Sequence, residues 1–76
     1  MPRLVSIDGV DISMYFRDHA PPHVHAYFGD EEALITIRDG LLYEGSLPAA
    51  KLVVAQSYVQ GNTEQLLARW VEYRGG

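Results

Sequence analysis

Apolar and polar residues alternate strictly along two segments of the chain, and this alternation restricts the fold more than any other feature. In residues 10–17 every second residue is apolar, namely Val10, Ile12, Met14 and Phe16. Residues 23–29 repeat the pattern with Val24, Ala26 and Phe28. A period of two is typical of a strand that buries one face. The preceding Asp8-Gly9 pair is a strong signal for a two-residue hairpin turn, which predicts a further strand over residues 3–7.

Turn residues divide the rest of the N-terminal half into strands. Pro21 and Pro22 cannot donate backbone hydrogen bonds, so they must interrupt the sheet between the two alternating segments. We expect the acidic run at 30–32 to be a solvated loop, followed by strands over 33–38 and 41–46 that a turn at Asp39-Gly40 joins. The pattern thus predicts an antiparallel sheet of four to five strands within residues 3–46.

From Pro48 onward the apolar period becomes helical. Pro48 is favourable in the first turn of a helix, and Gly61 is a natural stop. The apolar residues at helical spacing are Leu52, Ala55 and Val59 before Gly61, and Leu66, Leu67, Trp70 and Val71 after it. We expect helices at about 49–60 and 63–74, packed on one face of the sheet with Trp70 as the main anchor. Strands followed by helices indicate an α+β fold.

The length of 76 residues predicts a single domain over residues 1–76 with a small core, which usually needs a partner or an additional cross-link for stability. The absence of cysteine excludes disulfides, thiolate metal ligands and a cysteine nucleophile, and is compatible with the cytoplasm. No apolar run approaches the roughly 20 residues of a membrane span, so we expect a cytoplasmic protein without a membrane partner. With a net charge of −4 and six Lys and Arg residues, the chain is a poor non-specific nucleic-acid binder, although two or three arginines could still form a small RNA site.

The expected strand pairing collects polar side chains on the sheet face that the helices leave bare, because residues two apart on a strand share a face. The residues expected there are Ser13, Tyr15, Arg17, His23, His25, Tyr27, Thr36 and Arg38. Apart from Asp11 near the edge, we expect no carboxylate on this face. The candidate binding surface consists of Tyr15, Arg17, His19, His23, His25 and Tyr27.

The histidines allow three interpretations. Since His23 and His25 point the same way, His19 could complete a three-imidazole zinc site, although no cofactor is required. Alternatively, His23 and His25 could act as metal-independent acid–base catalysts on RNA, with Arg17 and Arg38 holding the phosphate. In the third interpretation, the polar residues simply form the solvated face of the sheet, and Asp18 hydrogen-bonds its own downstream backbone at the turn.

Residues Met14 to Ala26 contain the run Asp18-His19-Ala20-Pro21-Pro22-His23-Val24-His25. This run resembles the D/E-H-x-P-P-H-x-H core of the bacterial domain-of-unknown-function family 4160. The segment Glu44 to Pro48 and the last helix with Trp70 fit the same family pattern more loosely. The resemblance implies that the protein is one half of a two-gene module of suspected toxin–antitoxin character. Carried over residue by residue, the family motif marks the following site residues: His19, Pro21, Pro22, His23 and His25.

The leading functional hypothesis is therefore a protein-interaction component of a toxin–antitoxin-type module. Its expected partner is a small protein encoded nearby, and a homo-oligomer and RNA are further candidates. The first alternative is a metal-independent endoribonuclease-like toxin that uses His23 and His25 with Arg17 and Arg38. The second is a zinc-binding protein that uses His19, His23 and His25.

Overall fold

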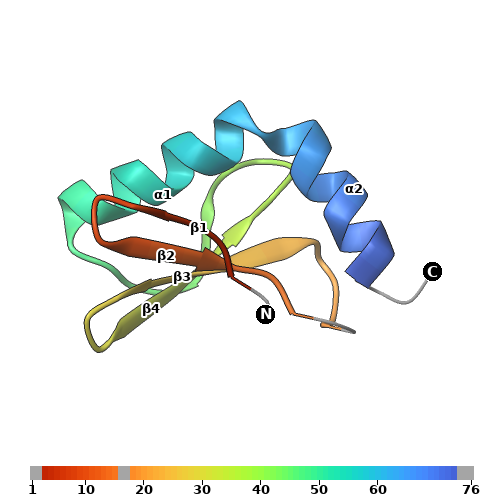
Figure 1. Cartoon of the computed structure of the whole chain (residues 1–76). Coiled ribbons are helices and arrows are strands. Elements are labelled where there is room, and N and C mark those ends of the chain that lie inside the picture. Colours follow the sequence, from red (N-terminus) through yellow and green to blue (C-terminus); the bar gives the residue numbers. More distant parts are fainter. Residues whose placement is uncertain (1–2, 16–17, 74–76) are drawn as a thin grey trace.

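The computed structural model describes residues 3–15 and 18–73, and within them all strands precede the helices (Figure 1). The elements are β1 (Arg3–Ile7), β2 (Val10–Ser13), β3 (His23–Phe28), β4 (Glu31–Thr36), β5 (Leu42–Gly45), α1 (Ala49–Gly61) and α2 (Thr63–Tyr73). The five strands form one antiparallel sheet in the order β1-β2-β3-β4-β5. The expected α+β fold is confirmed.

The first hairpin turn is the one that the sequence predicts. Asp8 has a φ of 52° and Gly9 a φ of 82°. Positive φ at both central residues is the requirement of a type I′ turn, whose twist matches that of the flanking strands. The turn aligns Ile7 with Val10, and so places β1 beside β2.

The acidic run is not a solvated loop, as the sequence had suggested. Glu31 and Glu32 belong to β4 and pair with Phe28 and Tyr27 of β3. The connection is a two-residue turn at Gly29 and Asp30, where Gly29 has a φ of 60°. Both glutamates are exposed, so a strand accommodates their charge without burying it.

Several strands are shorter than predicted. β2 ends at Ser13 instead of continuing to residue 17, and residues 16 and 17 lie outside the described part of the chain. β4 ends at Thr36, whose carbonyl accepts a hydrogen bond from the Gly40 backbone amide at 2.8 Å. Ile37 is fully buried although it lies in the turn. Alternation therefore identified buried strand residues such as Ile12 and Val24 but extended the strands into turns, and Val71, which has helical spacing, is exposed.

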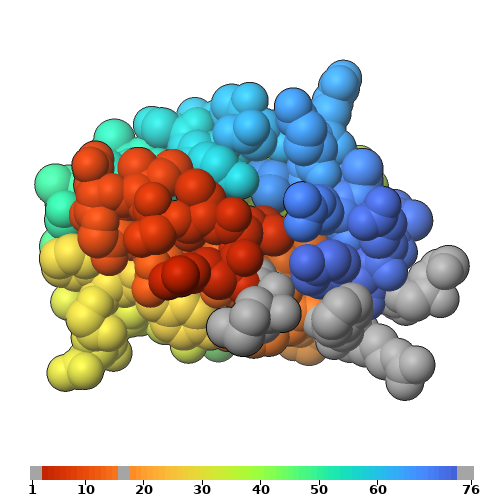
Figure 2. Space-filling model, viewed as in Figure 1, coloured from red at the N-terminus to blue at the C-terminus, as the bar shows by residue number. Residues whose placement is uncertain are grey.

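The two helices bury one pair of side chains each, at positions i and i+4. α1 lies across β2 and β4 and buries Ala55 and Val59, whereas α2 buries Leu66 and Trp70 (Figure 1). In the space-filling view, the N-terminal hairpin in red borders the cyan α1, and the blue α2 covers one end of the molecule (Figure 2). Neither helix of the described chain is long and apolar enough to cross a membrane.

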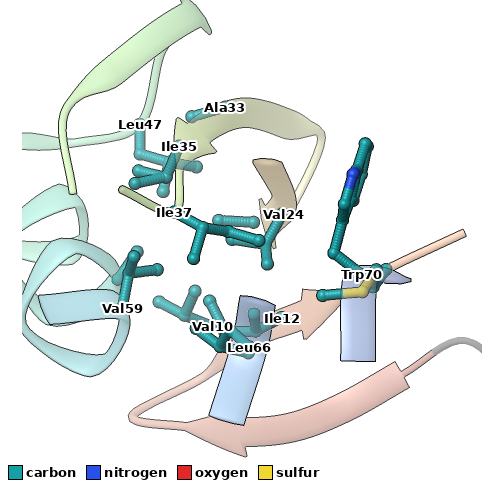
Figure 3. Packing of buried hydrophobic residues seen from close by; sticks show 13 residues of the cluster. Val10, Ile12, Val24, Ala33, Ile35, Ile37, Leu47, Val59, Leu66 and Trp70 are labelled. Carbon is teal, nitrogen blue, oxygen red and sulfur yellow. The ribbon is translucent and has the colours of Figure 1, made fainter. Parts of the chain in front are cut away.

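Trp70 stands at one side of the aliphatic cluster that fills the space between the sheet and the helices (Figure 3). Its side chain is only 5% exposed. The indole therefore covers the end of the sheet where β3 begins and packs against His23, with the ring centroids 5.3 Å apart. Trp70 is thus buried as predicted, and it also contacts one of the candidate site histidines.

Candidate functional site

Two histidines of β3 converge on one carboxylate from the preceding turn. The Asp18 Oδ2 atom lies 3.1 Å from Nε2 of His23 and 2.8 Å from Nε2 of His25. The two rings have their centroids 5.0 Å apart. His23 and His25 reach the same point because residues two apart on a strand project to the same side, and the turn returns Asp18 to it.

His23 is buried, contrary to the expectation that it lies on the bare face of the sheet. Its side chain has no exposed area, because Trp70 of α2 packs against it at the end of the sheet. The Nδ1–H donates a hydrogen bond to the carbonyl oxygen of Pro21 at 2.7 Å. Its Nε2 is also buried, yet it forms no hydrogen bond within the described part of the chain, although Oδ2 of Asp18 lies only 3.1 Å away.

His25 lies two residues further along β3, with its side chain 15% exposed. Its Nδ1 donates to Oε2 of Glu32 at 2.7 Å, while its Nε2 faces Asp18. The ring of Tyr15 meets the imidazole edge-on, with centroids 4.6 Å apart, and Tyr27 stacks on it at 6.3 Å. These contacts hold the His25 ring in one orientation.

The Asp18 carboxylate divides its two oxygens between the backbone and the imidazoles. Oδ1 accepts a hydrogen bond from the His19 backbone amide at 2.9 Å, as expected for an aspartate that opens a turn. Oδ2 accepts one from His25. Burial opposes ionisation of Asp18, but these two hydrogen bonds and the positive charge on His23 and His25 outweigh it, so the pKa of Asp18 is lowered.

A hydrogen-bonded tyrosine pair lies beside this cluster. The hydroxyl groups of Tyr15 and Tyr27 are 2.6 Å apart. Burial, the hydrogen bond to Tyr15 and the nearby Glu32 charge all raise the pKa of Tyr27 above its ordinary value. Tyr15 and Tyr27 are thus placed next to His25 as the sequence predicts.

Among the described residues, His19 and Arg38 lie outside the cluster. The His19 side chain is 76% exposed, although its Nδ1 lies 3.6 Å from Asp18 Oδ1 and its ring 5.6 Å from that of His23. Arg38 is exposed in the turn that follows β4. Arg17 lies outside the described residues.

The sequence pattern does not reveal the two carboxylates of the site. It indicates a turn for Asp18 and a solvated loop for Glu32, and it predicts a face without carboxylates apart from Asp11. The Gly29-Asp30 pair could have revealed Glu32. A two-residue turn there pairs Tyr27 with Glu32, which brings Glu32 diagonally opposite His25 and within reach of its ring.

An open hollow of about 120 Å³ adjoins the cluster on the sheet face and is lined by His25, Glu32, Leu34, Glu44 and Gly45. His25, Leu34 and Glu44 are cross-strand neighbours on β3, β4 and β5. Two carboxylates in so small a space favour a cation over an anion. Among the described residues, Asp18, His23 and His25 each offer a ligand atom, and these atoms lie within 4.8 Å of one another.

Comparison with known proteins assigns the chain to a family. Residues 9–71 match the family described as "Domain of unknown function (DUF4160)". The chain belongs to the DUF4160 family. No curated protein and no solved structure matches it. The match includes the whole cluster, from Asp18 to Glu32, as well as Trp70, so it covers the site and most of the helix that packs against it.

Proposed function

We propose that this DUF4160 protein is the protein-binding component of a cytoplasmic two-protein module of the toxin–antitoxin type, and that its partner is a small protein encoded nearby. The observation that carries the proposal is the open edge of the sheet at β5. Three consecutive large apolar residues are exposed there, Leu41 by 56%, Leu42 by 43% and Tyr43 by 48%. All four residues of β5 are exposed, and β4 is its neighbour in the sheet.

An apolar edge strand of this kind needs a partner. Its outer backbone groups can pair with another strand, and soluble proteins usually protect such edges with charge, proline or a covering element. β5 carries the charged Glu44, but Leu41, Leu42 and Tyr43 present an apolar and aromatic surface, which is typical of the centre of a protein interface. The partner is therefore expected to add a strand along β5, so that backbone hydrogen bonds and apolar contacts act together.

The size of the domain supports the same conclusion. A single core in a chain of 76 residues rarely contributes more than about 3–5 kcal/mol, so burying the β5 surface would add substantially to stability. A second copy of the chain could use the same edge and form a homo-oligomer. The experiment therefore has to distinguish the two occupants.

The test is co-expression with the product of the neighbouring gene, followed by co-purification and size measurement by light scattering. We expect a stable hetero-complex. Leu42→Lys places a charge on the edge strand and should reduce the recovered partner about tenfold or more. Val53→Lys is the matched control, because Val53 is similarly exposed, at 59%, but lies on α1.

Recovery of an isolated monomer from co-expressing cells would contradict the proposal. A homodimer that Leu42→Lys dissociates would assign the edge to self-association instead. Equal loss of the partner in Leu42→Lys and Val53→Lys would show that β5 is not the contact surface. Melting curves of both variants establish that the fold survives each substitution.

The geometry supports the endoribonuclease alternative less well. A general base for RNA cleavage needs an imidazole nitrogen within reach of the ribose hydroxyl. In the described structure, Nε2 of His23 is buried, and both nitrogens of His25 face carboxylates. The adjoining Glu32 and Glu44 would also repel a phosphate group.

A further inference from the structure

We infer that Asp18, His23 and His25 form a binding site for one divalent transition-metal ion, with zinc as the preferred occupant. Two imidazoles and one carboxylate are a ligand set that zinc accepts, at bond lengths of about 2.0–2.2 Å. Ligand atoms around a tetrahedral ion then lie about 3.3 Å apart. Asp18 Oδ2 already lies 3.1 and 2.8 Å from the two Nε2 atoms, and all three ligand atoms lie within 4.8 Å of one another, so small side-chain shifts would accommodate the ion.

The buried Nε2 atom of His23 is the observation that distinguishes this cluster from an ordinary polar network. Since Nδ1–H of His23 donates to the Pro21 carbonyl, Nε2 is the ring nitrogen that is left to bind an ion. Nε2 lies 3.1 Å from Oδ2 of Asp18, yet it has no hydrogen-bond partner among the described residues. A buried polar atom without a partner destabilises the folded state. A metal ion between His23 and Asp18 would give this nitrogen a partner and balance the charge of the carboxylate.

The groups behind the two imidazoles match those of metal-binding histidines. Such histidines almost always donate the second ring N–H to a backbone carbonyl or a carboxylate, which fixes the ring orientation and raises the basicity of the ligand nitrogen. His23 donates to Pro21 and His25 to Glu32, both at 2.7 Å. Both rings are therefore held with Nε2 toward the same point.

The charges of the cluster also suit a divalent ion. Asp18 and Glu32 together contribute two negative charges, which one divalent cation balances. Imidazole ligands favour zinc and its transition-metal neighbours over Mg²⁺ and Ca²⁺, which prefer oxygen ligands. The site is thus predicted to discriminate strongly against magnesium.

Asp18 takes the place in this set that the sequence had suggested for His19. With its side chain 76% exposed, His19 lies on the solvent side of the cluster. Three protein ligands leave a fourth position of a tetrahedral ion for water, as in catalytic zinc sites. Removal of the His19 imidazole should therefore leave metal binding largely intact.

Trp70 provides a built-in reporter of the site. It is the single tryptophan of the chain, and its ring lies 5.3 Å from that of His23. Titration of chelator-treated protein with ZnCl₂, followed by calorimetry and by Trp70 fluorescence, should show one ion per chain and a saturable change in emission. CoCl₂ should quench the same emission because the ion is paramagnetic, whereas MgCl₂ should have no effect.

The variants Asp18→Asn and His25→Gln test the ligand assignment, because both keep approximate size while replacing a ligand atom. Each should weaken zinc binding by at least about tenfold. His19→Ala is the matched control in the same turn and should change the affinity by less than about threefold. Far-UV circular dichroism confirms that each variant is folded before titration.

Three results would overturn the inference. The first is a folded wild-type chain that binds neither Zn²⁺ nor Co²⁺, in which case the cluster is a metal-free network of imidazolium and carboxylate groups. The second is zinc affinity that survives both Asp18→Asn and His25→Gln. The third is a loss in His19→Ala as large as theirs. None of these results depends on partner binding, so the metal site and the proposed function can be refuted independently of each other.

Discussion

The buried imidazole of His23 packs against the indole of Trp70, with ring centroids 5.3 Å apart and ring planes inclined by 52°. This contact joins α2 to the beginning of β3, where the histidine cluster lies. α2 therefore does more than cover the apolar face of the sheet. It also excludes water from one side of the cluster, so the stability of the helix and the geometry of the site are coupled.

Trp70→Ala should severely destabilise the chain, because truncation of a buried tryptophan costs about 3–5 kcal/mol, which is comparable to the whole stability of a domain of this size. We expect an early loss of far-UV circular dichroism in a urea titration. Val71→Ala is the control, since the neighbouring Val71 is 62% exposed and should change the midpoint little. Equal midpoints for the two variants would contradict this role of Trp70.

Gly45→Ala should cost more than about 1 kcal/mol of unfolding free energy. Gly45 has a φ of 81°, and a Cβ atom there would collide with the backbone carbonyl of Glu32. Gly61→Ala is the contrasting variant, because Gly61 ends α1 with open space around its Cα, and it should leave stability unchanged or slightly raised. Thermal unfolding of both variants measures the difference. A Gly45→Ala protein as stable as wild type would show that β5 can move away from β4.

The strands and helices could be predicted largely because local signals agreed with the final packing. The alternation around Ile12 and Val24 and the helical spacing of Leu66 and Trp70 all describe residues that are buried in the structure. The predicted strand boundaries were wrong where one local signal was given too much weight. The charge of Glu31 and Glu32 suggested a loop, but an exposed strand position tolerates charge once the Gly29-Asp30 turn has fixed the pairing.

The site could be predicted only in part, because its geometry depends on tertiary contacts. Residue spacing places His23 and His25 on one side of β3, and this relation is present in the structure. The burial of His23 depends on how far α2 extends past the end of the sheet, which no local pattern specifies. The approach of Asp18 likewise depends on the path of the chain between β2 and β3.

Stability should fall at alkaline pH through Tyr27. Its pKa is higher in the folded state than the ordinary value of about 10, so the folded state keeps the phenol proton longer than the unfolded state does. The stabilisation that the protonated Tyr27 gives to the folded state is complete below about pH 10. It is lost as the pH rises toward the pKa of Tyr27 in the folded state. Tyr27→Phe should therefore lose stability less steeply above about pH 10 than wild type. Thermal midpoints across this range measure the slope, with Tyr58→Phe on α1 as the control; identical slopes in wild type and Tyr27→Phe would refute the assignment.

Glu32→Gln should weaken zinc binding about 10- to 100-fold without removing any of the three ligands. The amide can still accept a hydrogen bond from Nδ1–H of His25, but it carries no charge, so the imidazole becomes a poorer donor of its Nε2 lone pair. Glu44→Gln removes the same charge from the same hollow, yet Glu44 makes no hydrogen bond to His25 in the described structure. Competition with a chromophoric chelator measures both affinities under identical conditions.

The comparison of Glu32→Gln with Glu44→Gln separates a specific hydrogen bond from general electrostatics. If the negative charge of the hollow alone attracts the ion, both variants should lose affinity to a similar and modest degree, and the loss should diminish as salt screens the charges. If Glu32 acts through His25, its variant alone should show the large loss, and added salt should change it little, because the contact at 2.7 Å leaves no room for intervening ions or water. Equal losses would therefore reject the role of Glu32 in orienting His25 while leaving Asp18, His23 and His25 as ligands.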